Sequence, residues 1–178
     1  MEAEQYCEDV ELLVDALGSI TQVEAENRLK KAQNAISTNF QRLTGRPDFS
    51  GLSIKVSPDG YQIEVTGSSL SREAVPILNQ GDLNCSALSI FLALAAAPET
   101  SHLLGFVILD DPSQSLDSTS KRNLCQVLEA ICDSRQLLIS TMDEELQNEI
   151  LKIGKAKSYY VFTGWNPTTG PQIERGLI

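Results

Sequence analysis

The sequence predicts an α/β fold with a parallel sheet core, preceded by a β-hairpin and N-terminal helices. Three observations point to this class. Short apolar runs suited to buried strands alternate with amphipathic helical segments over residues 82–162, an order typical of parallel sheets. Two alternating segments flank Pro58-Asp59-Gly60, which predicts a hairpin. A helical spacing of apolar residues covers most of the first 44 positions.

Residues 3–44 are expected to be helical and to carry two apolar stripes. The first stripe ends near Gly18-Ser19 and comprises Val10, Leu13, Val14 and Leu17. The second comprises Leu29, Ala32, Ile36, Phe40 and Leu43. Two interpretations stay open: a helical hairpin that packs on the domain, or the base of a longer coiled coil. Because Gly45-Arg46-Pro47 ends the helix, the chain divides into a helical segment, 1–45, and a lobe, 46–178.

The remaining elements are expected in a simple order. Strands are predicted over 52–56 and 61–65, followed by a mostly buried helix over 82–97. The α/β core then takes a strand over 106–109, a helix over 118–132, a strand over 137–139, a helix over 143–153 and a third strand over 158–162. The tail from Gly164 is rich in Gly, Pro and Thr and is expected to be loosely held.

Composition restricts the partners of this chain. It has 178 residues, with no apolar run near the roughly 20 residues that cross a bilayer. No secretory leader is visible, so we expect an intracellular protein without a membrane partner. The net charge of −10 repels phosphate backbones, so any DNA contact is expected from a local patch or a partner. The isolated His102 and the spacing of the four cysteines predict reduced thiols rather than a zinc site.

The strongest chemical signal is the segment FVILDDPSQSLD, residues 106–117. A buried strand delivers Asp110 and Asp111 at its carboxyl end, where ligands of open α/β sheets bind. One carboxylate there can hold a magnesium ion, usually through water, and the next can polarise an attacking water. A polar turn that merely ends a strand would explain the two acids alone, but not the whole string.

This segment resembles the Walker B motif and D-loop of ATP-binding-cassette (ABC) ATPases. Within them it is most similar to the heads of SMC, RecN, RecF and SbcC-type proteins, which act on DNA. Two further segments fall in the family's order: LNQGD at 78–82 resembles the signature motif, and LLISTMDEEL at 137–146 resembles the switch strand. The resemblance covers about residues 50–163 and implies a P-loop NTPase-like (ABC ATPase head) C-terminal lobe.

The resemblance implies roles for eight residues. Asp110 would bind Mg²⁺ and Asp111 would act as catalytic base. ATP would be contacted by the signature-like residues Asn79, Gln80, Gly81 and Asp82, by Asp117 across a dimer, and by Met142 at the switch. Physically, a glycine lets backbone approach a phosphate, and a helix N-terminus attracts anions. Simpler interpretations stay open, namely Asp82 as a cap or first-turn acid and Asp117 as an N-cap.

The chain also departs from the family's pattern. No Gly-x-x-x-x-Gly-Lys-Ser/Thr P-loop occurs in the sequence. The resemblance therefore implies that ATP and Mg²⁺ bind a composite site, completed in a dimer by a P-loop-containing N-terminal lobe or a second ATPase head. DNA would be contacted by the assembled complex, and ATP hydrolysis is expected only there. Asp111 is one methylene shorter than the family's Glu, and Met142 replaces His and cannot donate a hydrogen bond, which favours slow hydrolysis.

The leading hypothesis is therefore half of an ATPase head used in DNA repair or chromosome maintenance, cytoplasmic at the nucleoid or, in a eukaryote, nuclear. The alternative is a truncated or degenerate lobe that acts as a protein-interaction module. A third possibility, an unrelated metal-dependent α/β hydrolase, needs further acids or histidines at strand ends. For that role the sequence offers only Asp143-Glu144-Glu145 and a remote histidine.

Overall fold

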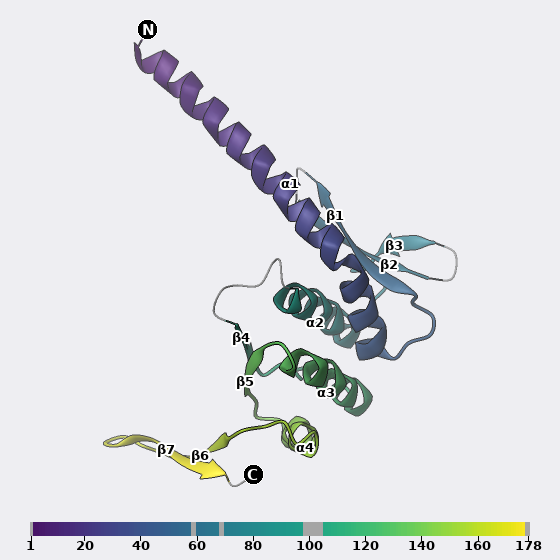
Figure 1. Ribbon diagram of the computed structural model, residues 1–178, viewed down its shortest axis with the longest axis vertical. Coiled ribbons are helices and arrows are strands. Elements are labelled where there is room, and N and C mark those ends of the chain that lie inside the picture. Colours follow the sequence, from purple (N-terminus) through teal and green to yellow (C-terminus); the bar gives the residue numbers. More distant parts are fainter. Residues whose placement is uncertain (1, 58–59, 68–69, 98–104, 177–178) are drawn as a thin grey trace. The chain divides into compact units, whose positions relative to one another are not determined.

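A computed structural model describes residues 2–57, 60–67, 70–97 and 105–176, which fall into two compact units (Figure 1). The unit Met1–Gly105 contains α1 (Glu2–Thr44), β1 (Gly51–Ser57), β2 (Gly60–Thr66), β3 (Ser71–Glu73) and α2 (Gln80–Ala96). The unit Phe106–Ile178 contains β4 (Phe106–Asp110), α3 (Ser118–Cys132), β5 (Gln136–Ser140), α4 (Glu144–Lys152), β6 (Tyr159–Asn166) and β7 (Gly170–Gly176). The predicted α/β class is confirmed. No described helix combines the length and apolar character that crossing a membrane requires.

The N-terminal helix α1 is one uninterrupted helix, so the interpretation as a helical hairpin is wrong. Gly18 lies within the helix, where a glycine costs only about 1 kcal/mol relative to alanine and does not force a break. The first apolar stripe is largely solvent-exposed, with Leu13, Val14 and Leu17 at 60–62% exposure, and Ile20 beyond it is 66% exposed. In Figure 1 this part of α1 extends away from the sheet β1–β3 of the same unit.

The second stripe of α1 anchors the helix in the core of the first unit. Ala32, Ile36 and Phe40 are buried in one cluster with the strand residues Leu52 and Val65. The cluster also includes Leu78 and Ala93, and α1 packs directly on α2 and β1. The apolar spacing at 29–43 therefore marks a packing face, whereas the spacing at 10–20 marks a face that no other described part of the first unit covers.

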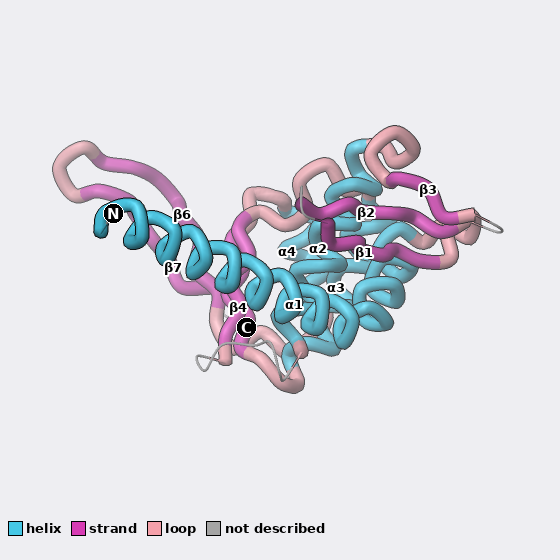
Figure 2. Tube along the Cα trace, turned by 90° about the horizontal axis from the view of Figure 1, so that it is seen from above, coloured by secondary structure: helices cyan, strands magenta, loops and turns pink. Residues whose placement is uncertain are grey.

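The predicted hairpin of the first unit is confirmed. β1 and β2 pair antiparallel, with Val56 opposite Tyr61 and Leu52 opposite Val65. The short strand β3, which the sequence pattern did not predict, extends the sheet on the other edge of β2. Figure 2 shows these three strands running beside the anchored part of α1.

The second unit contains a two-stranded parallel sheet. β4 and β5 pair in parallel, so that Asp110 lies beside Ser140 at their carboxyl ends. Along β4, Val107 and Leu109 are buried, whereas Phe106 and Ile108 are exposed. The helices α3 and α4 pack on each other within this unit.

The strand predicted over 158–162 is present as part of β6, but its expected place in the parallel sheet and the expected loose tail are wrong. β6 pairs antiparallel with β7 and not, among the described residues, with the parallel sheet (Figure 2). The tail is therefore an ordered hairpin strand rather than a loose end. Its turn is stabilised by the side chain of Asn166, which accepts hydrogen bonds from the amides of Thr168 (2.8 Å) and Thr169 (3.2 Å), and by Gly170 at φ 79°.

Candidate functional site

The carboxyl ends of β4 and β5 bring acids and hydroxyls together. Asp110 accepts a hydrogen bond from the Ser140 hydroxyl, and Asp111 Oδ1 accepts one from Thr141 Oγ1 at 3.2 Å. The Asp111 amide also donates to the Ser140 carbonyl oxygen at 2.8 Å. Sequence reasoning missed Ser140 and Thr141. The signal that could have found them is that two parallel strands place the first polar residues after each apolar run at one edge.

The loop after β4 is tightly folded around Asp111. Asp111 (φ 44°) and Ser115 (φ 63°) both adopt the left-handed backbone conformation, which aspartate tolerates better than most residues. Two turn hydrogen bonds follow, from the Gln114 amide to the Asp111 carbonyl (3.3 Å) and from the Leu116 amide to the Ser113 carbonyl (3.0 Å). The backbone at Asp111 thus turns sharply as the chain leaves the strand, and this fixes the direction of its carboxylate.

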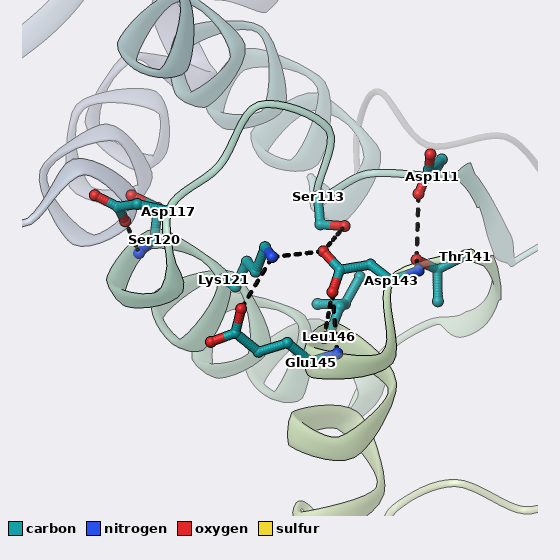
Figure 3. Close-up of polar contacts among 9 residues, drawn as sticks. All are labelled: Asp111, Ser113, Asp117, Ser120, Lys121, Thr141, Asp143, Glu145 and Leu146. Atoms are coloured by element: carbon teal, nitrogen blue, oxygen red, sulfur yellow. Dashed lines mark hydrogen bonds and ion pairs between the residues drawn. The ribbon is translucent and has the colours of Figure 1, made fainter.

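An ion-pair network connects this loop to the segment after β5 (Figure 3). Lys121 Nζ lies 2.7 Å from Asp143 Oδ2 and 3.0 Å from Glu145 Oε2. Ser113, which is only 3% exposed, donates its hydroxyl to the same Asp143 Oδ2 at 2.9 Å. The other Asp143 oxygen caps α4 by accepting from the amides of Glu145 and Leu146 at 3.0 and 3.2 Å. Asp143 is therefore shared by three segments of the chain.

The charges of this network are fixed at neutral pH. The hydrogen bond from Lys121, with further bonds from the Ser113 hydroxyl and the Leu146 amide, lowers the pKa of Asp143 from 3.8 to about 2. The same contacts with Asp143 and Glu145 raise the pKa of Lys121. Lysine and aspartate side chains are thus both ionised over the whole range in which the protein is expected to work.

We expect Asp143→Asn to destabilise the protein above about pH 4 and to matter progressively less below it. The folded state favours the Asp143 carboxylate, so its contribution is complete above the unfolded pKa of 3.8 and is lost as the pH falls through about 2. The variant keeps the capping oxygen but loses the acceptor for Lys121 and Ser113. Urea denaturation followed by circular dichroism at pH 7, 5, 4 and 3 measures the difference. An unfolding free energy difference that stays constant down to pH 3 would contradict this assignment.

An open polar cavity of about 310 Å³ lies between these loops. Its walls join the loop after β4 to the segment after β5 and consist of Asp111, Ser113, Gln114, Ser115, Leu116, Lys121, Met142 and Asp143. Asp111 and Met142, two residues selected from the sequence, are therefore brought together. The Met142 side chain is 94% exposed at this cavity, where its thioether cannot donate a hydrogen bond.

Asp117 is the N-cap of α3. Its carboxylate accepts a 2.7 Å hydrogen bond from the Ser120 amide, and this bond lowers the pKa of Asp117. The simpler interpretation of Asp117 as a cap is thus confirmed, while its role across a dimer stays a prediction. Lys121 follows one helical turn later, with its amide donating to the Asp117 carbonyl at 2.9 Å.

The signature-like residues lie in the other unit, at the start of α2. Asn79 is the N-cap, and its side-chain oxygen accepts a 2.8 Å hydrogen bond from the Asp82 amide. The buried Asp82 carboxylate lies 2.7 Å from Arg46 Nη1, so the charge of this first-turn acid is neutralised. The Gln80 side-chain amide donates a 3.1 Å hydrogen bond to Asn84 Oδ1, and Gly81 lies in the first turn of α2. Sequence reasoning missed Arg46, which follows the end of α1.

The described residues of this chain offer few ligands for a metal ion. No three His, Cys, Asp or Glu side chains cluster as a metal site in the described part of the chain. Mg²⁺ needs no such cluster, because it commonly takes one or two carboxylates and completes its shell with water and phosphate oxygens. The exposed Asp110 carboxylate at the end of β4 fits that donor set. All four cysteines are free, as predicted, and burial raises the pKa of the Cys125 thiol to about 11.

Comparisons with known proteins identify the fold. No family model matches the sequence. One solved structure that resembles the chain comes from work on ATP-driven dimerisation and DNA-stimulated activation of SMC ATPases. It aligns with TM-score 0.64 at 12% sequence identity, and the match covers 88% of this chain and 89% of that one. The chain shares its fold with SMC ATPase heads. The SMC head domain of Thermotoga maritima gives TM-score 0.57 at 16% identity, with 90% of this chain and 52% of that one covered.

A longer SMC head from Pyrococcus yayanosii, with a coiled coil and joint, gives TM-score 0.60 at 14% identity and covers 97% of this chain and 33% of that one. Among curated proteins, Arcadin-4 of Pyrobaculum calidifontis (strain DSM 21063 / JCM 11548 / VA1) is 28% identical over 137 residues, which is 74% of this chain. The chain spans only 17% of the length of Arcadin-4. The TM-scores of the solved SMC heads establish a shared fold, and the activity of this chain is a separate question.

Proposed function

We propose that this chain is the C-terminal lobe of an SMC-like ATPase head, which contributes a signature-like segment and a Walker B-like strand to a composite ATP site. The remaining P-loop lobe would come from a partner chain or from another part of the same gene product. The assembled head would act in DNA repair or chromosome maintenance at the nucleoid or in a nucleus, with DNA bound by the complex. The functional division would be a helical segment, 1–45, and an ATPase lobe, 46–178.

The observation that carries this proposal is the incomplete sheet behind the two acids. β4 and β5 pair only with each other among the described residues, although Asp110 and Asp111 lie at the carboxyl end of β4. One face of this pair exposes large apolar side chains, Phe106 (42%), Ile108 (60%) and Leu138 (46%). A two-stranded sheet with an exposed apolar face is a surface that a second element normally covers. A P-loop lobe that adds strands here would complete both the sheet and the phosphate site.

The exposed apolar stripe of α1 favours a second contact with the partner that carries the P-loop lobe, made by a helix that pairs with α1. Val10, Leu13, Leu17 and Ile20 follow steps of three and four residues, which suits a paired helix. No Lys or Arg occurs before Arg28, whereas Glu8, Asp9, Glu11 and Asp15 flank the stripe. Two copies of this segment would repel each other, so we propose a partner helix with basic flanks. α1 would then be the base of a coiled coil.

Each residue of the proposed site would have a separate role in binding or hydrolysing ATP. Mg²⁺, when bound with ATP, would neutralise phosphate charge, and Asp110 would be its protein ligand. Asp111, oriented by Thr141, would accept the proton of the attacking water. Asn79 and Gly81 would face a phosphate at the N-terminus of α2, where Arg46 offsets the repulsion of the Asp82 carboxylate. Met142 would provide no donor to a phosphate, which favours slow turnover.

The alternative function is a non-catalytic lobe that only binds proteins. The specific observation in its favour is the combination of an exposed Met142, at the place of the family's donor, with the shorter acid Asp111. The metal-dependent hydrolase is disfavoured, because no third metal-ligating side chain joins the two aspartates within the described residues.

We expect calorimetric titration of Mg-ATP into the isolated chain to give no detectable binding, because half of the phosphate contacts are missing. The same titration into the chain co-purified with its P-loop-bearing partner should show binding that weakens at least tenfold in Asp110→Ala. Tight binding by the isolated chain, lost in Asp110→Ala, would mean that the half-site assignment is wrong. An assembled complex that binds Mg-ATP equally well with either residue at 110 would favour the non-catalytic alternative.

A further inference from the structure

The network around Asp143 has a geometry that ordinary surface ion pairs lack. Lys121 and Asp143 are only 16% and 20% exposed, and the Ser113 that shares the carboxylate oxygen is buried. By contrast, Lys155 and Asp133, an ion pair in the same unit, are 38% and 75% exposed. A partly desolvated pair with a second hydrogen bond is held more strongly than an exposed pair, whose contribution is close to zero.

This network joins the two segments that carry the residues of the proposed site. Ser113 belongs to the loop between Asp111 and Asp117, and Asp143 directly follows Met142. Lys121 reaches this junction from the first turns of α3, the helix that Asp117 caps. The sticks in Figure 3 show the Lys121 ammonium pointing at Asp143, with Ser113 on the opposite side of that carboxylate.

We infer that Lys121 is a positioning residue: through Asp143, it holds the loop 111–117 and the segment 141–143 in one fixed relative arrangement. This inference rests on the proposed function, in which those two segments carry the base Asp111, the dimer contact Asp117 and the switch residue Met142. The base and the switch position would then keep their separation while a partner docks. The segments meet directly through the Ser113–Asp143 and Asp111–Thr141 hydrogen bonds, and Lys121 holds the Asp143 carboxylate where the Ser113 bond needs it.

Amide hydrogen exchange of the isolated chain tests this inference without nucleotide or partner. The reporters are the amides of Gln114 and Leu116, which close the turns of the first segment, and the capped amides of Glu145 and Leu146. Lys121→Met should speed exchange at both pairs by about tenfold, because it removes the charge-assisted contact that holds Asp143, on which the Ser113 bond and the cap of α4 both depend. Lys121→Arg, which keeps the charge and can still donate to Asp143, should stay within about threefold of the parent.

Two further variants separate positioning from general destabilisation. Lys155→Met removes the exposed ion pair of the same unit and should leave all four amides unchanged. Asp143→Asn keeps the cap of α4 but loses the acceptor for both Lys121 and Ser113, so it should speed exchange of the Gln114 and Leu116 amides at least as much as Lys121→Met does. Amides inside α3, such as that of Leu128, should keep their protection in every variant.

The inference is overturned if the Gln114 and Leu116 amides of Lys121→Met exchange at the parent rate. It is equally overturned if these amides exchange as fast in Lys121→Arg as in Lys121→Met. It is also overturned if Leu128 accelerates together with the loops, since Lys121 would then merely stabilise the unit. Failure of the proposed function is a different result, because absence of Mg-ATP binding by every assembled complex leaves these exchange rates unaffected.

Discussion

Asp111→Asn in the assembled head is expected to slow ATP hydrolysis by about 10²- to 10⁴-fold, the usual contribution of a general base. The amide has the size of the carboxylate and an oxygen that can still accept from Thr141, but it cannot take a proton from water. Nucleotide binding should change little, because Asp110 and the contacts at the start of α2 are untouched. Single-turnover hydrolysis, measured beside nucleotide affinity, separates the two effects.

Asp133→Asn is the matched control, since Asp133 is an exposed acid of the same unit that pairs with Lys155. It should hydrolyse ATP at the parent rate. If Asp111→Asn does the same, Asp111 is not the base, and the chain's part in the site would be limited to binding. Parallel losses of affinity and rate would instead make Asp111 a ligand.

Phe40→Ala should destabilise the first unit by about 3–5 kcal/mol, as expected for deleting a fully buried aromatic side chain. Phe40 lies in the cluster that joins α1 to the sheet, with Ile36 on the same helix and Leu52 and Val65 on the strands. Removing it leaves a cavity between the helix and the sheet that this small core cannot close. Urea denaturation followed by circular dichroism at neutral pH measures the loss.

Leu13→Ala on the same helix should cost less than about 0.5 kcal/mol, because Leu13 is 61% exposed. The two variants together distinguish the anchored part of α1 from the uncovered part. A large, concentration-dependent loss in Leu13→Ala would show that the stripe is already covered in the isolated chain by a second copy.

Much of the fold could be predicted because local patterns and tertiary packing agree. The alternation at 52–56 and 61–65 specified the hairpin, and the N-cap at Asp117 placed the start of α3 at Ser118. The string at 106–117 placed both acids at the end of a strand, although only one face of that strand is buried. At each of these positions the local preference and the final environment favour the same conformation.

Other elements could not be predicted, and the reasons are physical. A glycine in an exposed helical segment costs too little to end it, so Gly18 does not separate two helices. The strand at 158–162 was predicted, but its continuation to Asn166 was not, because a bulge between Phe162 and Gly164 disturbs the alternation that marks a strand. The residues Asn166 to Gly170 have turn composition, which fits a hairpin turn as well as a loose tail.

The candidate site was predicted only in part. Asp110 and Asp111 follow from the strand pattern, because their chemistry is visible in consecutive residues. Lys121 and Asp143 are 22 positions apart and meet only when the loops after β4 and β5 pack together. No feature of either residue's neighbourhood in the sequence distinguishes that pair from an exposed one.

Because α1 is anchored in the core at only one end, the helix can act as a lever arm. With a rise of about 1.5 Å per residue, the 20 residues from 5 to 24, all exposed except Gln22, extend about 30 Å beyond the anchored face. A tilt of about 10° at the anchored end would displace the far end by about 5 Å, as follows from that length. Small rearrangements of the core around Phe40 are thus magnified at the N-terminal end, and a load applied there acts on the same core.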